Sequence, residues 1–216
     1  MSGVTFPLFE LLPEHERQRE LSKLKIQKYC AGRVIYERGG DCTDAFFIFE
    51  GRVKIDTSRA GGETAFYHYR KPGGMIGYYA AITGKLQTVT ATAAEDTVLG
   101  RLNATEFMEL VLSSRELSAY MLRFVTGILR SETNRIRHLI LLDAPSRVAA
   151  ELLEYVAESG SHLVEIPERD ALASRLGMTR ETLARHLSEL QRRRLIAIKK
   201  QKIHIRDLKQ LSELVG

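Results

Sequence analysis

The sequence has few of the features that would assign a class at once. Its 216 residues include only two cysteines, Cys30 and Cys42, which are too few for a disulfide framework or a four-cysteine metal site. We expect both to be small, partly buried core residues, with a redox pair as the alternative. No apolar run approaches the ~18 residues of a membrane span. The N-terminus also lacks a secretory pattern, so we expect a cytoplasmic protein without membrane contact.

The usual signatures of an enzyme are missing as well. Gly73, Gly74 and Gly77 fit neither the dinucleotide-binding spacing nor the P-loop spacing. The sequence also contains no Ser-His-Asp pattern with local context and no cluster of metal ligands. We therefore do not expect an enzyme.

The positive charge is concentrated in one segment. The formal net charge of the chain is +5, but residues 175–206 contain ten basic and two acidic residues, a net of +8, which leaves −3 for the remainder. A concentrated basic segment is typical of a nucleic-acid-binding module.

The order of patterns predicts an α+β chain with three parts. A helical pattern over residues 9–24 precedes short β-branched or aromatic runs between residues 26 and 102, separated by turns such as RGGDCTD, SRAGGE and KPGG. Runs spaced ~8–12 residues apart favour a β-roll or jelly roll over βαβ units. The sequence thus predicts a sensor β-roll domain over 1–112, a long dimerisation helix over 113–143 and a winged helix-turn-helix domain over 144–216.

A long helix is predicted between the two domains. Asn103 and Glu106 have the spacing of a capping box that starts a short helix, and the chain then runs from 115 to 143 without proline. Its coiled-coil-like stripe consists of Leu117, Met121, Phe124 and Ile128. Because such a helix would overrun a small β-barrel, we favour pairing with a second copy over packing along its own domain. Pro145 in DAPS should end the helix and provide a hinge.

The segment DALASRLGMTRETLARHLSEL has helix-turn-helix spacing. It predicts a helix over 170–176, a turn at Gly177 and a second helix capped by Thr179. Leu183, Leu187 and Leu190 are expected to form the inner face of the second helix. The opposite, outer face would then be free to enter the major groove. The segment RRRLIAIKKQKIHI predicts a two-stranded wing that turns at 200–201. The residues expected to contact DNA are Thr179, Arg180, Glu181, Arg185, Lys199, Lys200 and Lys202.

Three segments together resemble one protein family. AGRVIYERGGDCTDAFFIFEGRVKI, PGGMIGYYAAITG and LGMTRETLARHLSELQRRRLI follow in order over nearly the whole chain. They resemble the family of the cyclic-AMP receptor protein and the fumarate–nitrate reduction regulator. The resemblance implies a homodimeric transcription regulator, a palindromic site in double-stranded DNA, a signal sensed in the β-roll, and RNA polymerase as a partner if the protein is an activator. It also implies that Arg180, Glu181 and Arg185 read each half-site.

The chain departs from the family at the cyclic-nucleotide ligands. Members that bind cyclic nucleotides carry Gly-Glu at the start of a short helix and Arg-Ser about nine residues later, whereas this chain has Gly77-Tyr78 and Gln87-Thr88. Without the guanidinium and the carboxylate, cyclic AMP is not the expected effector, although backbone N–H groups near Gly77 could still form an anion nest. The candidate effector pocket comprises Gly77, Tyr78, Tyr79, Gln87, Thr88, Glu132 and Thr133.

Several sensor chemistries remain to be weighed. Two cysteines exclude an iron–sulfur cluster of the usual kind. A haem bound through His68, which lies in sequence among Phe66, Tyr67 and Tyr69, is an alternative to another small metabolite and to a regulator that needs no ligand. No other metal ligand is proposed. A further alternative is a cyclic-nucleotide-type binding module that acts through a protein partner. His186, where the family usually has an aliphatic residue, is expected to be a half-buried structural histidine.

Overall fold

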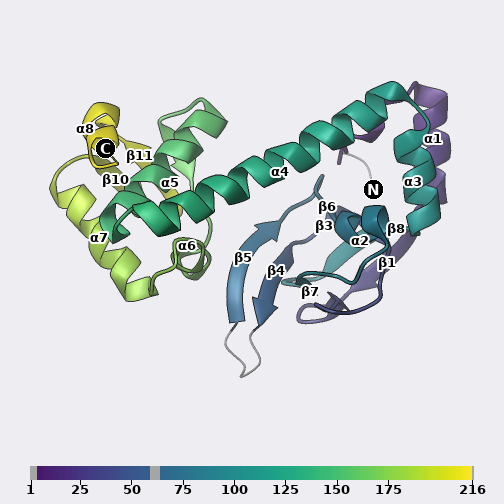
Figure 1. Cartoon of the computed structure of the whole chain (residues 1–216), viewed down its shortest axis with the longest axis horizontal. Coiled ribbons are helices and arrows are strands. Elements are labelled where there is room, and N and C mark those ends of the chain that lie inside the picture. Colours follow the sequence, from purple (N-terminus) through teal and green to yellow (C-terminus); the bar gives the residue numbers. More distant parts are fainter. Residues whose placement is uncertain (1–3, 59–63, 216) are drawn as a thin grey trace. The chain divides into compact units, whose positions relative to one another are not determined.

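The structure is a computed structural model that describes residues 4–58 and 64–215 (Figure 1). The described chain forms two compact units, residues 1–127 and 128–216. Helix α4 (Arg115–Leu141) passes from the first unit into the second. The division into three functional parts stays a prediction, and the loop within SRAGGE lies outside the described residues.

The N-terminal segment is helical in two pieces. The 3-10 turn η1 (Phe9–Leu11) precedes helix α1 (Glu14–Lys23). The helical pattern predicted over 9–24 is thus divided between these two elements. Pro13 is the reason, because a proline drives the residue before it into an extended conformation, and Leu12 has φ −89° and ψ 145°.

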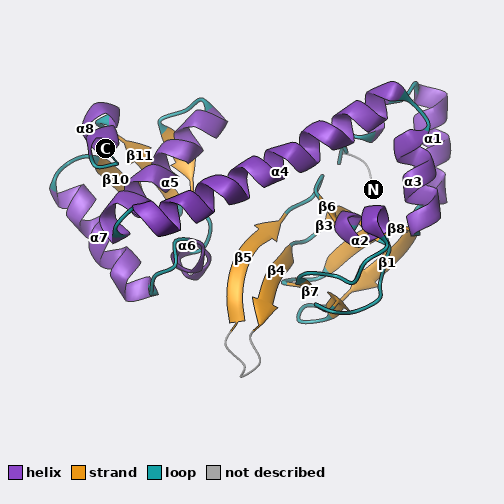
Figure 2. Cartoon of the chain, in the orientation of Figure 1, coloured by secondary structure: helices purple, strands orange, loops and turns teal. Residues whose placement is uncertain are grey.

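Two antiparallel sheets form the predicted β-roll (strands in Figure 2). The first has the order β1-β8-β3-β6 and the second β2-β7-β4-β5. The strands of the first sheet are β1 (Lys25–Tyr29), β8 (Thr97–Leu102), β3 (Ala45–Glu50) and β6 (Met75–Ile76). Those of the second are β2 (Val34–Tyr36), β7 (Thr90–Ala93), β4 (Val53–Ser58) and β5 (Thr64–Arg70). All but the two-residue β6 coincide with the predicted runs.

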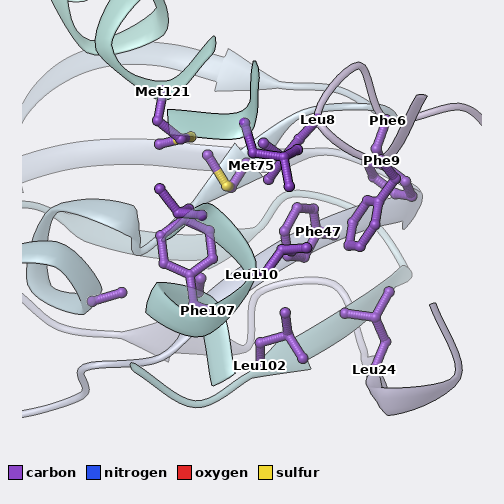
Figure 3. Close-up of a cluster of buried hydrophobic side chains, with 14 of the residues drawn as sticks. Phe6, Leu8, Phe9, Leu24, Phe47, Met75, Leu102, Phe107, Leu110 and Met121 are labelled. Atoms are coloured by element: carbon purple, nitrogen blue, oxygen red, sulfur yellow. The ribbon is translucent and has the colours of Figure 1, made fainter. Parts of the chain in front are cut away.

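Strand β3 lies between the two apolar clusters of this unit and contributes residues to both. Its segment AFFIF is buried throughout because each face of the strand meets a different apolar cluster. Phe46 and Ile48 lie in the cluster between the two sheets. Phe47 and Phe49 lie in the cluster under the helices, where Phe6, Phe9 and Phe107 surround Phe47 (Figure 3). The strand is therefore apolar on both faces.

Helices α2 (Tyr78–Thr83) and α3 (Ala104–Leu112) complete the first unit. The capping box at the start of α3 is confirmed, since the Asn103 side chain accepts from the Glu106 N–H at 2.9 Å and Glu106 accepts from the Asn103 N–H at 3.1 Å. The predicted stripe on α4 faces partly inward: Leu117 and Met121 are buried in the core of their own unit. A different row of apolar residues on α4 is exposed to solvent: Leu122, Val125, Leu129 and Ile136.

The second unit is a small helical domain with a three-stranded sheet. Its helices are α5 (Ala144–Ser159), α6 (Arg169–Arg175), α7 (Arg180–Arg192) and α8 (Leu208–Glu213). Its sheet has the order β10-β11-β9, made of β10 (Ile196–Lys199), β11 (Lys202–Ile205) and β9 (Leu163–Glu165). The wing hairpin is confirmed, whereas no strand was predicted over residues 163–165, where β9 lies. Asp143 caps α5, and Pro145 lies in its first turn, as expected of a helix break.

Candidate DNA-binding and sensor sites

The recognition helix α7 is set by its cap and its leucines. The Thr179 hydroxyl accepts from the Thr182 N–H at 3.2 Å, which confirms the predicted N-cap. Leu183, Leu187 and Leu190 are all fully or nearly fully buried. Gly177 has φ 63°, so the turn uses the left-handed region that glycine enters most easily. The helix-turn-helix geometry is thus the one that the sequence predicts, with α6 beginning and ending one residue earlier.

The outer face of α7 presents polar side chains to solvent. Arg180, Glu181 and Arg185 are all exposed, and the Arg180 Nη1 lies 3.4 Å from the Asp170 carboxylate. Hydrogen bonds from its own backbone N–H and from the Thr179 hydroxyl lower the pKa of Glu181, so this carboxylate is ionised at neutral pH. Ionised Glu and two Arg side chains are the groups that pair with cytosine N4 and guanine O6/N7.

The wing brings lysines to the same side of the domain. Lys199 and Lys202 pair across the hairpin, and Lys200 occupies its turn with φ 57°. A cavity of about 260 Å³ lies between this turn and the starts of α6 and α7, with Lys200, Arg180 and Arg169 among its lining residues. Arg169 was not singled out from the sequence, because the predicted helix began at residue 170 and α6 begins at Arg169. The start of the recognition helix and the turn of the wing therefore line one cavity, which also contains the acidic residues Glu168 and Asp170.

A buried polar network supports α6. The Arg175 Nε donates to the Glu151 carboxylate at 2.6 Å, and Glu151 is 3% exposed. Arg175 also contacts the Ser131 hydroxyl at 3.3 Å, and the Arg135 Nε donates to the Arg175 carbonyl at 3.0 Å. Burial, together with the Glu151 carboxylate, raises the pKa of Tyr155. The end of α4 is thereby held to α5 and α6, which no sequence motif indicated.

In the first unit, where the candidate effector pocket was predicted, Gly77 is required by the fold. It caps α2 with φ 76°, and a Cβ added there would lie 2.2 Å from the Asp44 carbonyl oxygen. Its N–H donates to the Tyr36 hydroxyl at 3.2 Å. One of the N–H groups of the expected anion nest is therefore already in use.

The residues at the two ligand positions have structural contacts. Gln87 is 3% exposed, and its amide donates to the Cys42 carbonyl at 2.8 Å. The Tyr78 ring packs edge-on against Phe124, with 5.2 Å between centroids. Tyr79 and Thr88 are exposed. These four residues and Gly77 belong to the first unit.

Glu132 and Thr133 belong to the second unit and have contacts there. The Glu132 carboxylate lies 3.3 Å from Arg135 and 4.0 Å from Arg175. The Thr133 hydroxyl donates to the Leu129 carbonyl at 2.8 Å. Their membership of an effector pocket with the tyrosines stays a prediction.

The cysteines and histidines have separate surroundings. Cys30 is exposed, so the expectation of a core position is wrong for it, whereas Cys42 is half-buried and burial raises the pKa of its thiol. His68 pairs with Ile55 across β4 and β5 and is half-buried. His186 is half-buried as expected, and burial lowers its pKa first, followed by the charge of Arg185.

Among the described residues, no three His, Cys, Asp or Glu side chains are arranged to hold a metal ion. No described helix combines the length and the apolarity that a bilayer span needs.

Comparison with known proteins matches both halves of the chain. The family model of the cyclic nucleotide-binding domain matches residues 26–114, and that of the Crp-like helix-turn-helix domain matches residues 146–214. The transcriptional regulator SdrP of Thermus thermophilus is 30% identical, over 85% of this chain and 91% of the relative. The cyclic AMP receptor protein of the same species is 25% identical, over 96% of each.

A solved structure agrees in fold. The CooA mutant from Carboxydothermus hydrogenoformans superimposes with a TM-score of 0.83 at 19% identity, over 99% of this chain and 98% of that chain. Both domains, in the same order, thus occur in named transcription regulators, and the chain is a DNA-binding regulator rather than an enzyme. It belongs to the family of the cyclic-AMP receptor protein and the fumarate–nitrate reduction regulator.

Proposed function

We propose that this regulator acts as a homodimer, reads a palindromic DNA site with α7, and responds to a signal other than cyclic AMP in its β-roll. One observation carries the DNA-reading part. A capped helix with a buried leucine face presents Arg180, Glu181 and Arg185 to solvent beside the lysine-bearing wing. Base contacts by these three residues select the sequence, and phosphate contacts by the wing fix the register.

The exposed row on α4 supports the homodimer. Leu122, Val125, Leu129 and Ile136 follow at spacings of 3, 4 and 7, and they are 70%, 41%, 65% and 55% exposed. This is heptad spacing, with Glu132 at the position between Leu129 and Ile136. A two-fold dimer through this row presents two recognition helices to half-sites one helical turn apart, and a palindrome is the matching DNA symmetry.

The contacts of Gln87 and Tyr78 support a different effector. A neutral amide committed to a backbone carbonyl cannot replace a guanidinium opposite a phosphate. An effector in the β-roll would bias two arrangements of the recognition helices, hinged near Asp143–Pro145. Contact with RNA polymerase belongs to the case in which the protein activates transcription.

DNA reading is tested by fluorescence anisotropy in 0.15 M salt, with a duplex selected from a random pool and a scrambled duplex. Arg180→Ala should weaken binding to the selected duplex about 10- to 100-fold, since a bidentate base contact is worth ~1–3 kcal/mol, and should spare the scrambled one. Lys200→Ala should weaken both by a similar factor and lower the salt slope by about one. If Arg180→Ala lowers both affinities equally, α7 does not read bases as proposed.

The dimer is tested with two matched substitutions. Leu129→Lys places a charge on the exposed row, whereas Leu141→Lys makes the same change at a similarly exposed position outside the row. Sedimentation velocity should show monomers for Leu129→Lys and dimers for Leu141→Lys. A dimer that survives Leu129→Lys would place the interface elsewhere.

The effector is tested by calorimetry with cyclic AMP. We expect no binding heat at millimolar nucleotide. Saturable binding at micromolar nucleotide would contradict the structural interpretation of Gln87.

A further inference from the structure

A second cavity, which lies in the first unit, shares no lining residue with the candidate effector pocket that the sequence predicted. Its volume is about 230 Å³, and its walls come from the N-terminal segment, β3, the β5–β6 loop and α4. The residues that define its character are Phe6, Phe47, Arg70, Met75, Tyr120 and Phe124. All belong to one compact unit, so the cavity is formed within the β-roll domain and its own stretch of α4.

Aromatic rings give the cavity a fixed apolar shape. Phe6 and Phe47 pack edge to face with 5.4 Å between centroids. Figure 3 shows both rings in the same cluster as Met75. Tyr120 and Phe124 also line the cavity, and their rings are nearly parallel, with an interplanar angle of 15°. Ring pairs of this kind restrict one another, so an apolar ligand would meet a preformed surface.

One cation lines this apolar wall. Arg70 is the last residue of β5 and is half-buried. Within residues 4–58 and 64–215 no side chain is within hydrogen-bond or ion-pair distance of its guanidinium, whose charge acts on the nearby Tyr36. A planar guanidinium is best satisfied by two carboxylate oxygens. An anion bound in the cavity would supply these oxygens to Arg70.

A second polar group lines the same cavity. Burial raises the pKa of Tyr120, so its hydroxyl stays protonated at neutral pH and can donate a hydrogen bond. The two anchors are therefore a cation and a hydroxyl donor, both on walls that are otherwise aromatic. Pockets for drug-sized molecules span ~300–1,000 Å³, so this smaller cavity suits a single ring with a short chain.

We propose that this cavity is the effector site of the regulator and that it takes a small monocarboxylate with an apolar, ring-sized body. The carboxylate would pair with Arg70 and accept from Tyr120, and the ring would lie among Phe6, Phe47 and Phe124. The site is distinct from the glycine turn at Gly77, where the sequence predicted an anion nest. The binding part stands on the cavity alone, while the effector part rests on the proposed function.

Binding is tested on the full chain without DNA. The probe is 3-phenylpropionate, and its uncharged amide is the control ligand. By calorimetry and saturation-transfer NMR, the acid should bind at least about tenfold more tightly than the amide, as expected for a charge-assisted pair. Arg70→Met should weaken the acid about 10- to 100-fold, whereas Arg33→Met, an exposed arginine outside the cavity, should not change its affinity.

Tyr120→Phe provides a second variant that removes only one oxygen. It should weaken the acid about three- to tenfold and leave the amide nearly unchanged, so the proposal can be judged even if Arg70→Met fails to fold. Absence of binding at millimolar acid overturns the site. Equal affinity of the wild type and a folded Arg70→Met variant overturns it as well.

The effector role is tested by anisotropy with the selected duplex. Saturating acid should change DNA affinity at least about threefold in the wild type and leave Arg70→Met unchanged. Binding of the acid without any change in DNA affinity overturns the effector role. Because the Arg180→Ala measurement contains no acid, failure here leaves the proposed DNA reading standing, and failure there leaves the cavity standing.

Discussion

Replacing Gly77 by alanine distinguishes two explanations for the presence of a glycine at the start of α2. The glycine could allow a ligand to approach the backbone, or it could be required by the fold. Gly77 has φ 76°, and an added Cβ would lie 2.2 Å from the Asp44 carbonyl oxygen. Gly84, at the other end of α2, has φ 65°, and a Cβ there would meet nothing within 4 Å. The two positions therefore differ in steric contact while sharing a backbone conformation.

The expected costs follow from these two geometries. An L-residue in the left-handed region costs ~1–2 kcal/mol, and both substitutions carry this cost. Only Gly77→Ala adds a clash with backbone, and overpacking of this kind costs ~1–3 kcal/mol. We therefore expect Gly77→Ala to lower the free energy of unfolding by ~2–5 kcal/mol and Gly84→Ala by ~1–2 kcal/mol.

Urea unfolding of the full chain, followed by far-UV circular dichroism, measures both variants against the wild type. A larger loss for Gly77→Ala identifies the fold as the reason for this glycine. Equal losses would refute the reasoning, because the contact with Asp44 would then carry no energy. A Gly77→Ala variant of wild-type stability with an altered ligand response would assign the glycine to ligand approach instead.

Three further predictions concern stability. Asn103→Ala removes the cap that accepts from the Glu106 N–H and should cost ~1 kcal/mol in urea unfolding; no loss would mean that the capping box is dispensable. Arg175→Met leaves the Glu151 carboxylate buried without its partner and should cost ~3–5 kcal/mol; adding Glu151→Gln should recover part of this loss, and a further loss would contradict the pairing. Burial and Glu151 raise the pKa of Tyr155, while an unfolded tyrosine titrates near ~10. The stability that Tyr155 contributes is therefore fully present below about pH 10 and is lost as the pH rises towards the pKa of the folded state. Tyr155→Phe should therefore reduce the dependence of the unfolding free energy on pH between about pH 9 and 11, the range around the unfolded pKa of ~10. An unchanged pH dependence would contradict this assignment.

Local patterns were enough to predict most of the β-roll and the helix-turn-helix. The caps at Asn103 and Thr179 and the turn at Gly177 depend only on neighbours within a few residues. Strands β6 (two residues) and β9 (three residues) escaped prediction because their own sequences show no alternating β-branched run bounded by turns. Each exists because a distant strand pairs with it, as Val164 pairs with Ile203. Such pairing is not visible in a short window.

The long helix shows a second limit of sequence patterns. Two rows on α4 have coiled-coil spacing, one through Leu117 and Met121 and one through Leu122 and Leu129. The sequence favoured the first row, but the structure buries its beginning against α3 and the N-terminal segment. Only the packing of distant segments decides which row stays exposed. Periodicity thus indicated a helix correctly and its free face incorrectly.

The sensor region was hardest to predict because its contacts cross several loops. Gln87 faces the Cys42 carbonyl, 45 residues away, and no family pattern specifies that bond. The second cavity is still less visible, because its lining comes from the N-terminal segment, β3, the β5–β6 loop and α4.

Phe124 connects the two sites of the first unit. Its ring packs against Tyr78 at the start of α2, and it also lines the cavity together with Arg70. Phe124 lies on α4 between the buried Met121 and the exposed Val125, so a ligand against its ring would contact the helix that carries the exposed apolar row. The Gly77 turn begins α2 and so places Tyr78 against Phe124. The fold therefore gives this glycine a structural role whichever ligand the β-roll takes.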